Sequence, residues 1–510
     1  MKLIARSSLI LAVFFGIDKV LAFVRQLLVA RQFSLSYELD VFNAANNIPD
    51  LLSALISGGA LGVALIPILS EYLENQGKKA AWDIFSRILN LAFIITAIIA
   101  TFIVLFAPWL VDHIIAPGFP EAQKSLTVEL MRLDLFAIII FSVSGLVMAS
   151  LQANQHFLLP ALAPTLYNIG QIFGVGILSP ENGFQLGPIQ LPAFGLGIHG
   201  LVYGVIIGAF LHLLIQIPGL IRFQFRWHPR IGLNHPGVRK VLRLLGPRVL
   251  TMFFIQLFFI IRDNLASGLG EGAVTSLNLG WFIMQVPETL LGTTFAIALL
   301  PSISEVFVQG DLALFKELVN KAIRILLAFS IPSAILLAIG IEPLVEYAFD
   351  FDPQGTQMVI SAARMYLLGL TGHTLLEIAS RSFYAQQNAR TPLFAAALNA
   401  ILYFILAKFL SNNMGSQGIA LANSIAFTTE ALLLLFLLRK IFPEILRIDK
   451  TILRIIFSTS ISAVGLFLLI RFSPIHPLIT SLVGMCLGFA LVIPFILPEI
   501  KALISLGSRE

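Results

Sequence analysis

The sequence predicts an all-α membrane protein with about fourteen transmembrane helices: two six-helix lobes related by a parallel repeat, plus two C-terminal helices. Three observations predict this fold. Of the 510 residues, 57% are hydrophobic and only 12% are charged, against roughly a quarter charged in soluble domains. Apolar runs of about 20 residues recur from end to end, and each can cross about 30 Å of hydrocarbon as a helix. The first half of the chain also recurs, in outline, in the second half.

The apolar runs define the expected spans and their grouping. The spans lie near 8–33, 40–70, 84–110, 128–151, 158–178, 196–219, 246–266, 273–300, 322–345, 358–380, 392–411, 417–438, 452–471 and 477–498. We group them into an N-terminal lobe over 1–221, a C-terminal lobe over 246–440 and a final pair over 451–499. A basic amphipathic linker over 222–245 joins the lobes, and its arginines and Trp227 suit the headgroup region of a membrane surface.

An internal repeat relates the two lobes. The segment Leu65–Glu71 reads LIPILSE, and Leu299–Glu305, 234 positions later, reads LLPSISE. Further along, Ala153–Gln155 matches Ala385–Gln387 at an offset of 232. Six helices separate the two copies, so both copies cross the membrane in the same direction. In transporters, a repeat of this kind places the substrate cavity between the lobes.

The net charge of +5 follows the membrane topology. With a cytoplasmic N-terminus, most Lys and Arg residues fall in cytoplasmic segments, including the cluster over 222–243. The opposite loops hold little beyond Arg31, Lys124 and Arg471. This asymmetry places both termini in the cytoplasm and segments 181–194 and 342–356 outside. The basic balance therefore predicts membrane lipids as partners and no nucleic acid.

Enzymatic and metal chemistry find no support in the motifs. Cys486 is the single cysteine, and the chain has neither a phosphate-binding glycine loop nor a His-Glu-x-x-His sequence. We therefore expect no catalytic residue, no metal site and no organic cofactor. Small residues recur every four positions at Gly170/Gly174 and Gly200/Gly204/Gly208, a spacing that lets helices approach closely. We interpret them as packing within the chain and expect a monomer.

Ionisable residues at membrane depth are the candidates for function, because each is costly unless it faces a cavity or a partner. In the first span, Lys19 lies at mid-helix, and Asp18 and Arg25 share one face; the alternative for Arg25 is an interfacial anchor. In the second span, Asp40, Asn43 and Asn47 share a face, which either lines a cavity or forms a polar seam between helices. Cations in a cavity predict an anionic substrate, and a lipid-linked diphosphate suits them.

A second candidate group lies near the far end of the seventh span. Arg262 and Asp263 are adjacent there. They either neutralise each other or line the cavity, and the sequence leaves both readings open.

The sequence also resembles a known family. The stretch Lys19–Arg25, the motif VARQF over 29–33 and the motif DVFNAA over 40–45 resemble the MurJ (MviN) family, as do IPDLL over 48–52 and APGF over 116–119. That family comprises the lipid II flippases of the MOP exporter superfamily. The resemblance implies alternating access of two lobes, which moves an undecaprenyl-diphosphate-linked peptidoglycan precursor to the outer leaflet. It also implies that the last two helices form a groove for the lipid tail.

The resemblance extends to site residues, with departures. It implies that Lys19, Arg25 and Asp40 belong to the substrate site. Ser53 stands where the family often has Arg, and Trp281-Phe282 stand where it has an acid or amide followed by Arg. These departures leave the exact headgroup open, and Arg262 is the candidate to compensate for the missing cations.

The resemblance further implies a Na⁺ site in some members, between the seventh and eleventh spans. Asp263 and Asn399 are the oxygen-bearing candidates here. We expect the membrane potential to be the main coupling force and Na⁺ to be secondary, with Asp263 as a neutraliser of Arg262 as the alternative.

Other functions stay open at this stage. They are a flippase for another polyprenyl-diphosphate-linked glycan, a multidrug antiporter of the same superfamily, and a scaffold for cell-wall assembly that transports nothing. An antiporter of cationic drugs should carry cavity acids rather than Lys19 and Arg25.

Overall fold

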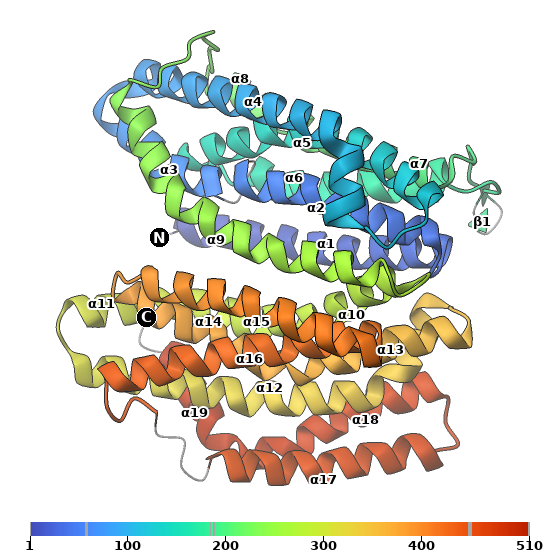
Figure 1. The fold of residues 1–510 in the computed structure, drawn as a ribbon. Helices are drawn as coiled ribbons and strands as arrows, with labels where there is room; N and C mark the ends of the chain where they lie inside the picture. The colour runs from blue at the N-terminus through green and yellow to red at the C-terminus, as the bar shows by residue number, and fades with distance from the viewer. Residues whose placement is uncertain (1, 57–59, 184, 187–188, 447–450, 508–510) are drawn as a thin grey trace. The chain divides into compact units, whose positions relative to one another are not determined.

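Two compact units, Met1–Glu271 and Gly272–Glu510, make up the protein, both almost wholly helical (Figure 1). The computed structural model describes residues 2–56, 60–183, 185–186, 189–446 and 451–507. The predicted all-α membrane fold is confirmed.

Unit 1 is built around α5, which packs against α2, α3, α4 and α7, while α6 packs against α1 and α7. A short hairpin of β1 and β2 pairs Gln185 with Gln190. The elements are α1 (Lys2–Phe33), α2 (Tyr37–Ile56), α3 (Ala60–Asn75), α4 (Gly77–Leu110), η1 (Val111–Ile115), α5 (Glu121–Ala153), α6 (Leu158–Phe173), η2 (Gly174–Leu178), β1 (Gln185–Leu186), β2 (Ile189–Gln190), α7 (Gly197–Leu214), α8 (Ile217–Arg222) and α9 (Pro236–Ala266).

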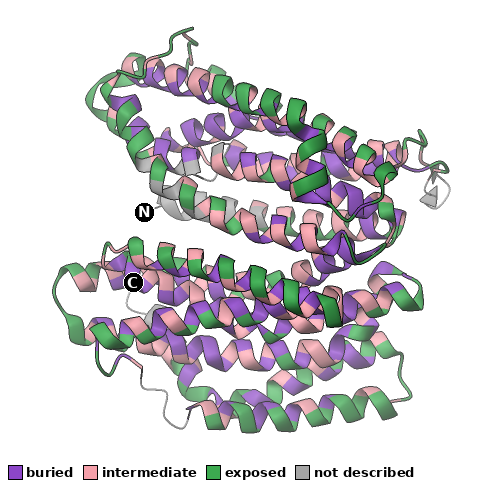
Figure 2. Ribbon diagram, viewed as in Figure 1, coloured by how far each residue is buried: buried purple, intermediate pink, exposed green. Residues whose placement is uncertain are grey.

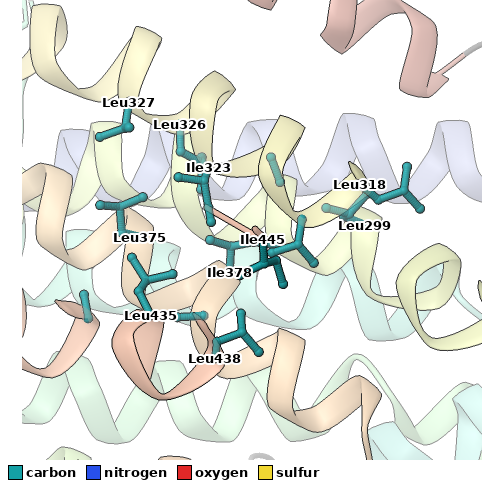
Figure 3. Close-up of a cluster of buried hydrophobic side chains, with 14 of the residues drawn as sticks. Leu299, Leu318, Ile323, Leu326, Leu327, Leu375, Ile378, Leu435, Leu438 and Ile445 are labelled. Atoms are coloured by element: carbon teal, nitrogen blue, oxygen red, sulfur yellow. The ribbon is translucent and has the colours of Figure 1, made fainter. Parts of the chain in front are cut away.

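Unit 2 packs around α12, α14 and α16. Its core is an aliphatic cluster that includes Ile323 of α12, Ile378 of α14 and Leu438 of α16 (Figure 3). The elements are α10 (Ala273–Glu288), η3 (Thr289–Thr293), α11 (Thr294–Val308), α12 (Leu312–Phe349), α13 (Pro353–Leu368), α14 (Leu370–Ala385), α15 (Arg390–Met414), α16 (Ser416–Ile441), α17 (Thr451–Phe472), α18 (Pro477–Val492), η4 (Ile493–Phe495) and α19 (Leu497–Gly507).

The internal repeat is visible in backbone geometry. Gln155 and Gln387, aligned at the offset of 232, both have a φ of 58° at the turn that follows a long helix. A positive φ is uncommon outside glycine, so this coincidence marks equivalent turns. The prolines aligned by the repeat also lie inside helices in both copies: Pro67 in α3 and Pro301 in α11.

Ten described helical segments are long and apolar enough to cross a membrane. The predicted spans near 8–33, 40–70, 246–266 and 358–380 are not among the ten; they correspond to α1, to α2 with α3, to α9, and to α13 with α14. The exposed faces of the spans are apolar, and α17 has many exposed residues (Figure 2). Phe102, Leu105 and Phe106 of α4 are more than half exposed, as suits side chains that meet lipid.

The linker and the boundary between the lobes differ from the prediction. Residues 223–235 have no helix, and α9 begins at Pro236, ten residues before the predicted span. Pro236 suits the first position of a helix, and the His235 side chain accepts a hydrogen bond from the Gly237 amide. α9 packs on α2 and α3 within unit 1, whereas the repeat assigned this span to the C-terminal lobe.

The last span also differs from the prediction at its end. The helix predicted over 477–498 stops at Val492, and a short 3-10 turn containing Pro494 leads to α19. Pro494 lacks an amide proton and so cannot continue the hydrogen-bond ladder.

Candidate functional site

The candidate cations Lys19 and Arg25 lie on α1. Lys19 is about 25 Å from Lys2 and about 21 Å from Phe33 along the helix axis, so it is a mid-helix residue. Lys19 is exposed, which leaves its ammonium accessible to a ligand. Arg25 is half-buried on another face of the helix, in electrostatic range of Asp18 on α1, Asp50 on α2 and Tyr167 on α6.

Asp18 connects this cation group to α6. The Asn168 side-chain amide donates a hydrogen bond to Oδ1 of Asp18 over 2.8 Å, and α1 packs along α6. Asp18 and Arg25 are seven residues apart and share a helix face, as the sequence predicted. The anchored carboxylate balances part of the charge on Arg25, so a stronger anion could replace it as the partner of the guanidinium.

A second polar group joins α2 to α9. Nδ2 of Asn47 donates to Oδ2 of Asp263 over 2.7 Å, and Nε of Arg262 donates to Oδ1 of the same carboxylate over 2.6 Å. The Arg262 guanidinium also lies 5.2 Å from the centre of the Phe259 ring. Arg262 is 4% exposed and Asp263 is 0% exposed. In this conformation the charge of Arg262 is therefore satisfied within the protein.

Asp40 occupies the same helix as Asn47, two turns earlier, and is only 1% exposed. Asn47 and Asp40 therefore form part of a buried polar face of α2, as their spacing predicted. Ser53, at the position where the resembled family often has Arg, is half-buried on the same helix.

Asn399 lies in unit 2, on α15, and its partner there is Glu430 on α16. Nδ2 of Asn399 donates to Oε2 of Glu430 over 2.6 Å, and the two residues are 2% and 7% exposed. Asp263, the other residue of the predicted cation pair, belongs to unit 1. The sequence carried the signal for Glu430, since it is the single acidic residue within the apolar run 417–438.

Aromatic side chains surround Trp281 on α10, where the resemblance led us to expect a cation. The Trp281 ring lies edge-to-face with Tyr366 at 5.6 Å and with His373 at 5.5 Å. Nε2 of His373 pairs with Oδ1 of Asn423 over 3.0 Å. Trp281 and Phe282 are both half-buried, so apolar surface occupies the place of the charge.

Taken together, the groups on α1 offer two cations at membrane depth, one of them exposed. Such a pair can bind an anion by charge-assisted hydrogen bonds, and burial in a low dielectric strengthens them. Three polar residues of unit 1, Asp134, Tyr167 and Asn168, were not among the predicted site residues. They lie on α5 and α6, whose compositions are those of ordinary membrane spans.

Comparison with known proteins bears on this arrangement. The family model described as "Lipid II flippase MurJ" matches residues 29–486. The lipid II flippase MurJ of Burkholderia cenocepacia is 31% identical over 449 residues, which cover 85% of this chain and 84% of that protein. A probable lipid II flippase MurJ of Buchnera aphidicola is 28% identical, covering 89% of this chain and 88% of that protein.

Solved structures share the fold. A structure titled "Lipid II flippase MurJ, inward closed conformation" superposes with a TM-score of 0.80 at 23% identity, covering 97% of this chain and all of that one. A multidrug resistance MATE family transporter of the MOP superfamily, in an inward-facing conformation, gives a TM-score of 0.71 at 15% identity, covering 84% of this chain and 95% of that one. The family model spans most of the sequence, and the chain belongs to the MurJ family of lipid II flippases.

Proposed function

We propose that this protein moves lipid II, the undecaprenyl-diphosphate-linked peptidoglycan precursor, from the inner to the outer leaflet of the bacterial cytoplasmic membrane by alternating access. Membership of the MurJ family supports the substrate. The observation that carries the proposal is the pair of cations on α1. A charged ammonium at the middle of a membrane helix is energetically costly, and a bound anion offsets that cost. The protein acts as a transporter, with no catalytic residue assigned.

The headgroup site in this proposal centres on Lys19 and Arg25. The diphosphate binds the Lys19 ammonium first and then competes with Asp18 and Asp50 for the Arg25 guanidinium. Asp40 and Asn47 line the headgroup site on the α2 side. Arg262 binds the headgroup only in a conformation in which its ion pair with Asp263 is broken. The undecaprenyl tail lies along α17 and α18, where Phe467 of α17 is 55% exposed and Leu487 of α18 is also 55% exposed.

A depletion experiment tests the substrate directly. A bacterium depleted of its own lipid II flippase should resume growth and division when this chain is expressed. A flippase for another polyprenyl-linked glycan, a drug antiporter or a scaffold would leave the depleted cells to lyse, although the chain is present in the membrane.

The proposed topology has both termini in the cytoplasm, with 181–194 and 342–356 outside. We expect a membrane-impermeant thiol reagent to label Asn182→Cys and Gln354→Cys in intact cells, and Arg230→Cys only after the membrane is opened. The parent is Cys486→Ser, which removes the one native cysteine. Labelling of position 230 from outside would reverse the assignment.

For coupling, we propose that the membrane potential drives the cycle and that a Na⁺ site at Asp263 and Asn399 is secondary. An anion leaving an inside-negative cell gains about 2.3 kcal/mol per charge per 100 mV. In proteoliposomes with a clamped potential, the rate of flipping should follow the potential. Any effect of Na⁺ on that rate should be small, and Asp263→Asn should reduce it. A rate of flipping that does not depend on the potential but requires Na⁺ contradicts this order.

The functional unit is proposed to be a monomer without a nucleic-acid partner.

A further inference from the structure

One carboxyl group of unit 1, that of Asp134, lies deep in a membrane helix and has no ion-pair partner among the described residues. Asp134 is on α5, about 20 Å along the axis from Glu121 and about 29 Å from Ala153. It is 4% exposed, and its Oδ1 is buried without a hydrogen-bond partner among the described residues. An ionised carboxylate in such a place is costly, so the neutral, protonated acid is the favoured form here.

The charged neighbour of Asp134 has the same sign. Asp50 lies on α2, which packs along α5, and it acts on Asp134 electrostatically. Tyr167 on α6 is in range of Asp134, Asp50 and Arg25. On α5 itself, Arg132 is two residues away and therefore projects to another side of the helix. Its Nε donates to the Val104 carbonyl over 3.2 Å.

Several other titratable groups on elements packed against α5 are paired with other residues. Arg87 of α4 pairs with Asp83, and the two histidines of α7 pair with Glu129 and Ser144. The remaining pairs are Glu71 of α3 with Lys240, and Asp112 of η1 with Lys124. Asp50 is the charged group that acts on Asp134 electrostatically.

From this geometry we infer that Asp134 is a proton-binding site linked to the headgroup site through Asp50 and Arg25. The link to the headgroup site rests on the proposed function, whereas the proton-binding site does not. Asp50 is exposed and lies in range of the Arg25 cation, whereas Asp134 is buried and has no ion-pair partner among the described residues. Two neighbouring carboxyl groups do not ionise together readily.

Headgroup binding changes this balance. A diphosphate bound to Arg25 neutralises part of the positive charge that compensates Asp50. The electrostatic potential at Asp134 then becomes more negative, and Asp134 holds its proton more tightly. By reciprocity, a proton on Asp134 must strengthen headgroup binding by the same factor. Loss of the proton leaves a carboxylate on Asp134 and releases H⁺ to water.

The linkage can be measured with the purified full-length protein in detergent and fluorescent lipid II. We expect the wild-type Kd to rise about tenfold between about pH 6 and about pH 9, because the carboxylate formed on Asp134 repels the bound anion. Asp134→Asn should bind tightly at both pH values, because it cannot ionise. Glu121→Gln, an exposed change on the same helix, should keep the wild-type dependence. A wild-type Kd that is flat, or a dependence that survives in Asp134→Asn, overturns the linkage.

The proton itself has a readout that needs no ligand. The infrared carbonyl band of buried protonated acids should be weaker in ligand-free Asp134→Asn than in the ligand-free wild type. An unchanged band in that variant overturns the proton site. If the infrared band changes in Asp134→Asn as expected but the wild-type protein binds no lipid II, the proton site stands and the proposed function is refuted instead.

Discussion

Replacing Lys19 or Arg25 with alanine should abolish lipid II flipping while the protein remains in the membrane at wild-type level. Each change removes one cation from the headgroup site, and a charge-assisted hydrogen bond to phosphate in a low dielectric is among the strongest single contacts available. Removing one such contact should cost on the order of 2–4 kcal/mol, or roughly 30- to 1000-fold in affinity. Rescue of flippase-depleted cells, together with membrane abundance, measures the effect.

Lys19→Arg is the informative companion. A guanidinium keeps the charge and binds phosphate with two parallel donors, so this variant should support growth. Lys78→Ala, which removes an exposed lysine at the start of α4, should behave as wild type. Growth of the Lys19→Ala, Arg25→Ala double variant would show that the headgroup site does not depend on these charges.

Gly204→Ala should separate α6 from α7 and destabilise unit 1. A Cβ at position 204 would lie 2.7 Å from the Cα of Gly174 and 3.0 Å from the carbonyl oxygen of Gly170. These are backbone atoms of α6 and of η2, which follows it directly, so relief requires the helices to move apart. We expect a loss of about 1–3 kcal/mol, seen as a lower Tm of the detergent-solubilised protein.

A matched glycine provides the control for this packing. Gly465 lies in α17 with nothing within 4 Å of an added Cβ. Gly465→Ala should leave the Tm unchanged or slightly higher, since alanine favours the helix. Equal effects at 204 and 465 would mean that close packing of α6 on α7 is not what these glycines provide.

Hydropathy, the repeat and the small-residue spacing were sufficient to predict most of the fold. They indicated the helical class, the correspondence of Ala153–Gln155 with Ala385–Gln387, and close helix packing at the spaced glycines. They did not predict that α9 packs in unit 1, because a repeat reports common ancestry of segments and not their contacts. The start of α9 was also misplaced, since Pro236 begins the helix before the apolar run does.

The site was predictable only in part. Lys19 and Arg25 stand out because charges in an apolar run are rare, and the pairing of Arg262 with Asp263 follows from their adjacency. The contacts of Asn47 with Asp263 and of Asn399 with Glu430 join helices far apart in the chain. No local pattern encodes such contacts. Asp134 was not predicted because it shares its span with Glu129 and Arg132, and no spacing pattern links it to the candidate residues of the first two spans.

The most direct test of the account is flipping by the purified protein in liposomes that contain fluorescent lipid II. Wild-type protein, with an inside-negative potential across the vesicle, should bring inner-leaflet lipid II within reach of a membrane-impermeant quencher, and Arg25→Ala should leave it protected. If folded wild-type protein leaves the inner-leaflet lipid II protected, or if Arg25→Ala exposes it equally fast, the proposal of a cationic lipid II site on α1 is wrong.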